Sequence, residues 1–288
     1  MRIAIASGKG GTGKTFFSTN LFYVLDKKGH KVTLTDCDAE EPNSNLFFNG
    51  KPSKQINVTQ INPIIDLDKC KYCGKCSEWC NYNAIFFLSE QKVINVIDDL
   101  CHGCGACFEV CKFKAINEKE VSLGKINFID ISENSQIIES RTKVGVYTPV
   151  PLIKRAIKES GNRGIILFDA PPGTSCPFIH TVDNADYIIL ITEPTPFGLS
   201  DLKQSIEILK DLNKHFGVVI NRADDDYRDI HNYLQVNKIP LLLEIPFDRD
   251  IAKQYSQGEI YAKTNTNFGN TLYKTVNKII NEYGNSSN

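Results

Sequence analysis

The chain has 288 residues, of which 41% are hydrophobic and 23% are charged, as in ordinary globular proteins of one large or two modest domains. Its 33 basic residues nearly balance its 34 acidic residues, so the net charge favours neither a nucleic acid nor an anionic membrane as a partner. No apolar run approaches the roughly 20 residues that cross a bilayer, and glycines interrupt the apolar N-terminal stretch where a signal peptide would continue. We therefore expect a cytoplasmic protein without membrane insertion.

The first residues predict the start of a parallel α/β sheet. A strand at residues 3–6 leads through a glycine loop to a helix at 14–28 and a second strand at 31–35, an order that builds parallel sheets. Short apolar runs predict further strands, buried on both faces, at residues 164–169, 187–192, 216–220 and 241–245. Helical spacing of apolar residues predicts a helix at 198–213. We expect a mostly parallel sheet flanked by helices.

Residues 61–117 interrupt this pattern with short turns, paired glycines and cysteines, and a predicted hairpin of residues 84–88 with 92–97. We interpret this segment as a small inserted α+β domain. The flanking residues, 1–60 and 118–288, then form one discontinuous domain. Residues 125–131 and 143–147 are expected strands that lead from the insert to a helix at 152–159.

The Walker A pattern fits one loop, placed between a strand and a helix, which reads Gly8, Lys9, Gly10, Gly11, Thr12, Gly13, Lys14 and Thr15. Glycines allow backbone N–H groups to converge on phosphate oxygens, and the helix N-terminus adds positive potential. Lys14 is expected to reach the β and γ phosphates, and Thr15 to bind Mg²⁺. The loop therefore predicts a nucleotide site.

A second lysine, Lys9, lies inside this loop. With it, the sequence resembles the deviant Walker A motif of the MinD/ParA group of P-loop ATPases, which includes nitrogenase iron protein. The resemblance implies an α/β P-loop NTPase fold, ATP hydrolysis with Mg²⁺, and a homodimer with ATP at its interface. It also implies that Lys9 reaches the nucleotide of the second subunit. On the residues alone, a solvated loop lysine is the alternative.

Two further segments resemble the switch regions of this group. Residues 35–42 resemble switch I, and residues 169–173 resemble switch II. A carboxylate at the carboxyl end of a parallel strand suits hydrated magnesium, so Asp169 is the expected metal residue, with Asp36 in support. By analogy, Asp38 positions the attacking water and completes the expected catalytic set with Lys9 and Lys14.

Two dipeptides that follow later strands resemble the segments with which this group holds adenine. Asn221 and Arg222 follow one strand, and Pro246 and Phe247 follow the next. The first pair is expected to offer an amide to the edge of the base and the second pair an apolar wall. Ordinary loops at strand ends are the alternative.

Eight of the ten cysteines lie between Cys70 and Cys111, in two runs of the form C-x2-C-x2-C-x3-C that repeat after 31 residues. Without an export signal, metal ligation or redox chemistry explains such thiols better than disulfides do. Paired C-x2-C units also build zinc sites, but two complete runs exceed what one zinc ion needs.

These runs resemble bacterial two-cluster ferredoxins, with Asn81 and Lys112 in place of the usual proline after the fourth cysteine. In those ferredoxins, the fourth cysteine of each run binds the other cluster. The resemblance therefore implies two [4Fe-4S] clusters with crossed ligands, which are Cys70, Cys73, Cys76 and Cys111 for one cluster and Cys101, Cys104, Cys107 and Cys80 for the other.

Two cysteines lie outside these runs. Cys37 falls between Asp36 and Asp38 and is expected to be a small side chain in a strand. Cys176 follows Asp169 by seven residues, which is the separation between switch II and a cluster ligand in nitrogenase iron protein. A structural or helix N-terminal cysteine is the alternative for Cys176.

The insert lies between the two expected switch regions, which reorganise with the γ-phosphate in related ATPases. We therefore predict an ATPase in which nucleotide-driven dimer switching gates electron transfer through the clusters to an unidentified redox partner protein. An iron-sulfur cluster carrier or metallocofactor assembly ATPase is the alternative. A membrane-positioning ATPase like MinD is a third reading, although the last expected helix, residues 270–283, has only Lys274 and Lys278 as basic residues.

Overall fold

A computed structural model describes residues 1–223 and 226–284. Within them, nine strands form one sheet in the order β11-β10-β9-β1-β8-β2-β7-β6-β3. The strands are β1 (Arg2–Ala6), β2 (Val32–Asp36), β3 (Lys51–Ile65), β6 (Ile116–Asp130), β7 (Ser135–Thr142), β8 (Ile165–Asp169), β9 (Tyr187–Thr192), β10 (His215–Ala223) and β11 (Leu241–Pro246). The strands from β11 to β7 are parallel, whereas β6 and β3 are antiparallel to their neighbours. The predicted mostly parallel sheet is confirmed.

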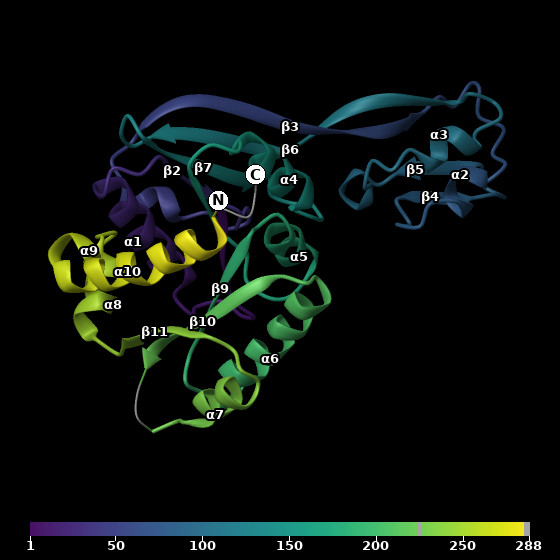
Figure 1. Ribbon diagram of the computed structural model, residues 1–288. Helices are drawn as coiled ribbons and strands as arrows, with labels where there is room; N and C mark the ends of the chain where they lie inside the picture. The colour runs from purple at the N-terminus through teal and green to yellow at the C-terminus, as the bar shows by residue number, and fades with distance from the viewer. Residues whose placement is uncertain (224–225, 285–288) are drawn as a thin grey trace.

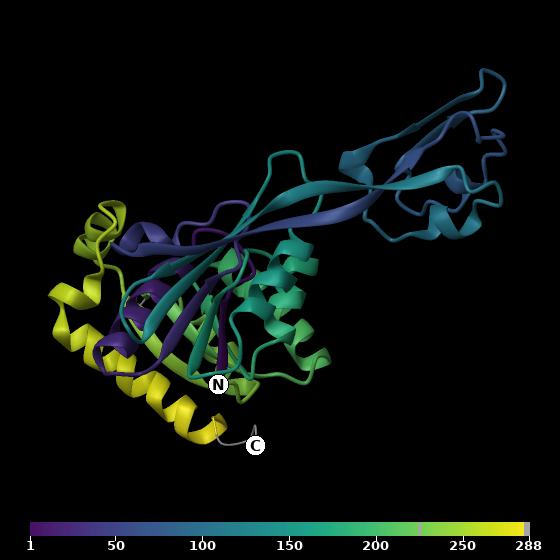
Figure 2. The same cartoon turned by 90° about the horizontal axis from the view of Figure 1, so that it is seen from above.

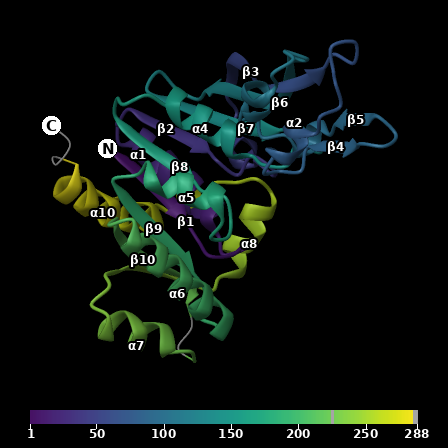
Figure 3. The same cartoon turned by 90° about the vertical axis from the view of Figure 1, so that its right-hand side faces the viewer.

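Helices cover both faces of the sheet (Figure 1; Figure 3). One face packs against α1 (Lys14–Lys27), α9 (Tyr261–Thr264) and α10 (Thr266–Tyr283), and the other against α4 (Val150–Glu159), α5 (Cys176–Asp183), α6 (Pro196–Asp211) and α7 (Asp229–Val236). Successive strand residues point to opposite faces, so Ile3 and Ile5 join one core while Ala4 and Ala6 join the other. Both cores are apolar, which explains the continuous apolar runs of the central strands. A further helix, α8 (Arg249–Ser256), follows β11, and a short 3-10 helix, η1 (Ser44–Phe47), follows β2.

The longest strands, β3 and β6, pair along their whole length, from Lys51 opposite Asp130 to Ile65 opposite Ile116. Only residues 124–130 of β6 also pair with β7. The remainder leaves the sheet as a twisted two-stranded ribbon (Figure 1; Figure 2). The boundaries predicted for an inserted domain, residues 61 and 117, fall inside these two strands, and the division into domains stays a prediction.

Residues 66–115, which we call the cysteine lobe, lie at the far end of the ribbon (Figure 2). The lobe contains α2 (Lys75–Glu78), β4 (Ile85–Leu88), β5 (Val93–Val96), η2 (Asp98–Leu100) and α3 (Ala106–Val110). The predicted hairpin is present as β4 paired with β5. Buried residues of the lobe, such as Cys76, Ile85, Ile94 and Cys107, form an apolar cluster separate from those of the main sheet.

The 31-residue repeat extends beyond the cysteines. In the β4–β5 hairpin, Ile85 lies opposite Val96 and Leu88 opposite Val93. The positions related to these by 31 residues also pair, because Ile116 lies opposite Ile65 and Lys119 opposite Asn62. The repeat therefore includes the far end of the ribbon, so that β3 and β6 continue into the lobe.

One expected strand is wrong. Residues 143–147 form a turn rather than a strand, and Gly145 has a φ of +90°, a conformation that favours glycine and ends a strand. The strand that returns from the ribbon is β7, residues 135–142. The strand expected at 125–131 is present as the second half of β6.

Candidate nucleotide site and cysteine hollows

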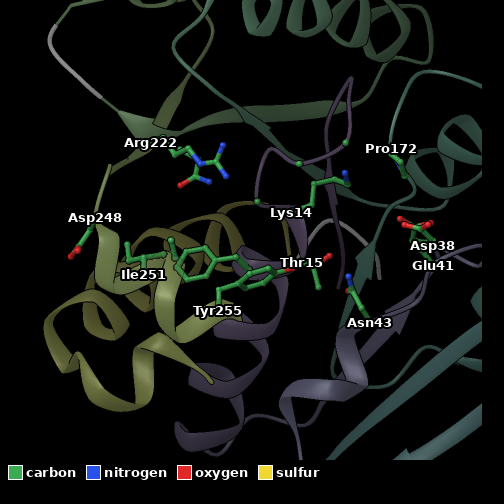
Figure 4. A pocket seen from close by; sticks show the side chains of 16 residues that line it. Lys14, Thr15, Asp38, Glu41, Asn43, Pro172, Arg222, Asp248, Ile251 and Tyr255 are labelled. Atoms are coloured by element: carbon green, nitrogen blue, oxygen red, sulfur yellow. The ribbon is translucent and has the colours of Figure 1, made fainter. Parts of the chain in front are cut away.

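A cavity of about 410 Å³ lies at the carboxyl ends of the parallel strands (Figure 4), where α/β proteins commonly bind ligands. Its walls come from the glycine loop, the carboxyl end of β10 and the segments that follow β2, β8 and β11. Residues that line it include Gly10, Gly11, Gly13, Lys14, Thr15, Asp38, Glu41, Asn43, Pro172, Asn221, Arg222, Asp248, Ile251 and Tyr255. Residues that lie far apart in the sequence therefore meet in one cavity.

The glycine loop is held against β10. The Asn221 side-chain amide donates a hydrogen bond to the Thr12 carbonyl at 2.8 Å. A Cβ atom at Gly13 would lie 2.3 Å from the same Asn221 nitrogen, and Gly13 has a φ of +94°. Gly8 likewise has no room for a side chain, because a Cβ would lie 2.5 Å from the Asp201 carbonyl. Close packing, as well as phosphate access, therefore requires these glycines.

The ammonium group of Lys14 is buried beneath the loop. Its Nζ lies 3.0 Å from the Ser7 hydroxyl and 3.5 Å from the Lys9 carbonyl. Burial lowers the pKa of Lys14, and the nearby carboxylates Asp169 and Asp38 partly oppose that effect. A phosphate would supply the counter-charge that this desolvated cation favours.

Asp36 of β2 and Asp169 of β8 lie side by side on neighbouring strands behind the cavity. Asp36 accepts hydrogen bonds from the backbone N–H groups of Asp38, Asn43 and Ser44, and burial together with Asp169 raises its pKa to about 8. Its carboxylate therefore shapes the loop of residues 37–44. Neither Asp36 nor Asp169 is among the residues that line the cavity.

Asp169 links the metal-binding candidates. Its carboxylate accepts hydrogen bonds from Ser18 at 3.0 Å and Ser44 at 3.2 Å. Burial raises its pKa, while the charge of Lys14 and a hydrogen bond from Thr15 oppose that rise. Asp38 faces the cavity, and burial and then Asp169 raise its pKa to about 6.

An oxygen-rich set of this kind fits Mg²⁺, since the Thr15 hydroxyl and Asp38 line the cavity while Asp169 lies behind Thr15. Over residues 1–223 and 226–284, no three His, Cys, Asp or Glu side chains converge on one metal-binding point. Magnesium needs no such group, because it keeps several waters and binds one or two protein oxygens together with substrate phosphates.

Lys9 forms an ion pair with Glu193, at 3.5 Å. The same Glu193 carboxylate contacts the Arg222 guanidinium at 2.6 Å. Glu193 follows β9 directly and was not singled out by its sequence. It connects the extra lysine of the loop to Arg222, which lines the cavity.

Only one of the two segments expected to hold adenine lines the cavity. Asn221 and Arg222 line the cavity, whereas Pro246 and Phe247 are exposed and are not among the lining residues. Helix α8 contributes Ile251 and Tyr255 there instead (Figure 4). Their spacing of four residues places both on one helix face, a signal in the sequence that could have identified this wall.

Strand β7 holds the loop that contains Asp38. The Ser140 hydroxyl donates to the Asp36 carbonyl at 2.6 Å, the Thr142 N–H donates to the Ala39 carbonyl at 2.8 Å, and the Arg141 guanidinium donates to the Pro42 carbonyl at 3.3 Å. Since β7 also pairs with β6, one continuous set of hydrogen bonds connects the cavity to the ribbon.

The eight clustered cysteines gather around two hollows in the cysteine lobe. The first hollow, which we call the Cys70 hollow, is lined by Cys70, Cys73, Cys76 and Cys111. The second, the Cys101 hollow, is lined by Cys101, Cys104, Cys107 and Cys80. In each, the fourth cysteine comes from the other run. The crossed grouping expected from the ferredoxin resemblance therefore matches the two sets of thiols that share a hollow.

Backbone amides point at these sulfurs with the same repeat. The N–H groups of Tyr72 and Gly103 donate to Cys70 and Cys101, each two residues earlier, at 3.4 Å. Ala84 and Ala115 donate to Cys80 and Cys111, each four residues earlier, at 3.3 and 3.4 Å. At Cys101, burial raises the pKa of the thiol and the hydrogen bond from Gly103 opposes that rise, while burial raises the pKa of Cys107 to about 11.

Each set of thiols has the number of ligands that a [4Fe-4S] cubane takes. A cubane binds four thiolates, one at each of its irons, and four cysteines line each hollow.

The remaining cysteines differ in accessibility. Cys37 is buried between the carboxylates, and burial raises its pKa well above the ordinary value. Cys176 is exposed at the first turn of α5. Neither lines a cysteine hollow. Within the described part of the chain, no helix is both long and apolar enough to cross a bilayer.

Comparison with known proteins matches most of the chain. Residues 3–261 match the family described as the CobQ/CobB/MinD/ParA nucleotide binding domain. Two uncharacterized proteins of Methanocaldococcus jannaschii are similar over nearly their whole length. MJ0578 is 34% identical over 97% of this chain and 96% of its own, and MJ0579 is 30% identical over 97% of this chain and 98% of its own.

More distant proteins share the fold or part of the sequence. The septum site-determining protein MinD of Pyrococcus horikoshii OT3, solved with Mg-ADP, superposes with a TM-score of 0.59 at 20% identity, over 96% of this chain and 95% of its own. At that identity the likeness is one of fold. An iron-sulfur cluster carrier protein of Aquifex aeolicus is 23% identical over 89% of this chain and 60% of its own length.

Proposed function

The chain belongs to the CobQ/CobB/MinD/ParA family of nucleotide-binding ATPases, and we propose that it is a Mg²⁺-dependent ATPase whose nucleotide state gates electron transfer through two [4Fe-4S] clusters. One observation carries the proposal. Two crossed four-cysteine hollows lie at the end of a ribbon that is hydrogen-bonded, through β7, to the loop that contains Asp38.

The residues of the cavity have distinct roles in this proposal. The glycine loop and Lys14 bind the phosphates, and the buried Lys14 cation stabilises charge that develops on the transferred phosphoryl group. Thr15, with Asp169 behind it, would hold Mg²⁺, which supplies further positive charge to the phosphates. Asp38 orients the attacking water and accepts its proton, for which its carboxylate must be ionised.

Closure of a homodimer is the step that responds to ATP. Lys9 leaves Glu193 and reaches the nucleotide of the second subunit, as the resemblance to deviant Walker A ATPases implies. Movement of the loop of residues 37–44 is transmitted to β7, because two of its carbonyls, those of Ala39 and Pro42, accept hydrogen bonds from that strand, as does the carbonyl of Asp36 directly before the loop. The ribbon then changes the position of the cysteine lobe relative to the main sheet. The clusters of the lobe, when bound, accept and release single electrons.

Anaerobic redox titration followed by electron paramagnetic resonance tests this function. The titration is run with ADP and with a non-hydrolysable ATP analogue. A cluster potential that differs between the two nucleotides supports gating. Lys14→Ala should abolish ATP-dependent electron delivery and leave the iron content intact. Wild-type delivery by that variant would show that the ATPase and the clusters act separately.

A second candidate is an iron-sulfur cluster carrier, favoured by similarity to the Aquifex aeolicus protein. A carrier should lose iron to an apo-acceptor on the timescale of its ATPase cycle. Clusters for gated electron transfer should stay bound, since four thiols surround each hollow. Incubation of the iron-loaded protein with an apo-ferredoxin, followed by separation and iron analysis of both proteins, distinguishes the two.

A further inference from the structure

Besides Lys69, which pairs with Asp66 at 2.8 Å, four positions of the repeat hold a lysine beside the Cys70 hollow and an uncharged residue in the other half of the cysteine lobe. Around the Cys70 hollow stand four exposed lysines, which are Lys71, Lys75, Lys112 and Lys114. Their counterparts, 31 residues away, are His102, Ala106, Asn81 and Asn83, around the Cys101 hollow. The acidic residues, by contrast, are equal in number in the two halves, with Asp66, Asp68 and Glu78 in one and Asp98, Asp99 and Glu109 in the other. The Cys70 hollow therefore has a surplus of positive charge that the Cys101 hollow does not have.

Two of these lysines line the hollow itself, and the other two flank Phe113, which also lines it. Lys71 and Lys75 themselves line the Cys70 hollow, while no Lys, Arg, Asp or Glu lines the Cys101 hollow. Of the four lysines, only Lys75 forms an ion pair among the described residues, with Glu78 at 2.7 Å. Most of this positive charge is therefore free to attract a partner.

The aromatic contacts at the two hollows also differ. At the Cys101 hollow, Tyr82 stacks on His102 with ring centroids 3.8 Å apart, and Tyr147 from the loop after β7 lies 5.1 Å from the same His102 ring. At the Cys70 hollow, Phe113 takes the position of Tyr82, and the exposed fractions of the two rings are similar, 45% and 41%. Cys73 is exposed, as is its counterpart Cys104. The loop after β7 thus reaches the Cys101 hollow, and the Cys70 hollow is lined by the ribbon and the cysteine lobe alone.

We propose that the lysine rim of the Cys70 hollow is the docking site for an acidic one-electron carrier of the ferredoxin or flavodoxin class. This inference rests on the proposed function. The carrier presents carboxylates to Lys71, Lys75, Lys112 and Lys114, with its redox centre beside Cys73. One electron passes between that centre and the adjacent cluster, so that one centre is oxidised as the other is reduced. Opposite charges steer such encounters and raise association rates.

Binding of the iron-loaded protein to an acidic plant-type ferredoxin tests the proposal without any activity assay. The affinity is measured anaerobically over a series of salt concentrations. Zero-length carbodiimide cross-linking with peptide mapping then identifies the contacting residues. Substitution of all four rim lysines by glutamine should weaken binding at low salt by at least about tenfold, and the difference should shrink at high salt. Cross-links should map to the rim lysines.

A matched control removes the same charge elsewhere. Glutamine replaces four exposed lysines of the α/β region, which are Lys210, Lys263, Lys274 and Lys278. This variant should bind within about twofold of the wild type. Equal losses in both variants, or cross-links that map outside the rim, would overturn the proposal. So would tight binding of duplex DNA that the rim substitutions abolish, because the rim would then be a nucleic-acid site.

The outcomes separate this inference from the proposed function. If cross-links map to the rim but the cluster potentials are the same with either nucleotide, the docking site is supported and the gating is refuted. If the potentials depend on the nucleotide but the rim binds no ferredoxin, the gating is supported and the docking site is refuted.

Discussion

Lys9 and Glu193 form an ion pair within one chain, with 3.5 Å between the ammonium nitrogen and a carboxylate oxygen. A lysine that acts on the nucleotide of a second subunit must first leave this partner. Glu193→Gln should therefore favour the ATP-bound dimer, by up to about fivefold in the ATP concentration at half-maximal dimerisation, since partly exposed pairs contribute about 0.2–1 kcal/mol. Sedimentation velocity over an ATP series measures the shift.

Glu159→Gln serves as the control for this prediction, because it removes a carboxylate that pairs with Lys54 and Arg155 far from the cavity. It should leave dimerisation unchanged. If Glu193→Gln weakens the dimer, Glu193 supports the active arrangement rather than the resting one.

The buried carboxylate of Asp36 predicts how stability varies with pH. Its pKa in the folded state is about 8 against an ordinary 3.8, so the folded protein holds this proton more tightly than the unfolded chain. Its contribution to stability is fully present below about pH 4 and is lost as pH rises through about 8. The free energy of unfolding of the nucleotide-free protein should fall between pH 5.5 and 8, and Asp36→Asn should flatten that fall.

Urea unfolding at several pH values measures this effect, which is expected to be on the order of a few kcal/mol. Asp38→Asn is the internal comparison. The pKa of Asp38 is about 6, so its effect should be confined to the acidic side of that value. A wild-type profile that rises with pH up to 8 would contradict the assignment.

Crossed ligation predicts an unusual pattern of cluster loss. Cys111→Ser should remove the cluster of the Cys70 hollow, although Cys111 belongs to the second run in sequence, and Cys80→Ser should remove the other. Each variant should keep about half of the iron. Combining Cys111→Ser with Cys73→Ser should cost no more iron than Cys111→Ser alone, because both thiols line one hollow.

Iron analysis and electron paramagnetic resonance measure these losses, with Cys176→Ser as the control, since Cys176 lines neither hollow. Additive iron loss in the Cys73 and Cys111 double variant would show that the ligands are not crossed.

Tyr147 connects the loop after β7 to the ring of His102, at the Cys101 hollow. Tyr147→Ala should weaken the effect of nucleotide on the cluster at that hollow and spare the cluster at the Cys70 hollow. ATP hydrolysis should persist, because Tyr147 does not line the cavity. Nucleotide-dependent redox titration of each cluster provides the measurement.

Tyr147→Phe keeps the ring and should retain the nucleotide effect. An equal loss at both clusters in Tyr147→Ala would place the coupling in the ribbon instead of this contact.

Local signals in the sequence predicted the parts of the molecule that depend on short spacing. The strands at 187–192 and 165–169 were predicted because short continuous apolar runs are typical of strands that are buried on both faces. The glycine loop and the two cysteine runs are equally local. Even the grouping of Cys111 with Cys70 followed, because the spacing matched a known pattern.

The remainder depends on contacts between distant segments. The first half of β3 is largely exposed and polar, with Pro52 near its start, and it pairs with residues more than sixty positions away. Nothing local in it indicates a long strand. Glu193 and the β7 contacts to Ala39 and Pro42 were missed for the same reason, since each acquires its role only when the sheet brings it to the cavity.

The paired strands β3 and β6 also fix a length. Each residue adds about 3.3 Å of strand, and removal of one residue would turn every following side chain to the opposite face. Removal of two residues from each strand, at positions that pair, would instead draw the lobe about 7 Å closer and keep each side chain on its own face of the ribbon, with the lobe rotated by the twist of the removed segment. The ribbon thus sets the distance between the cysteine lobe and the main sheet. Shortening it in such steps would separate the dependence of electron transfer on this distance from its dependence on the nucleotide.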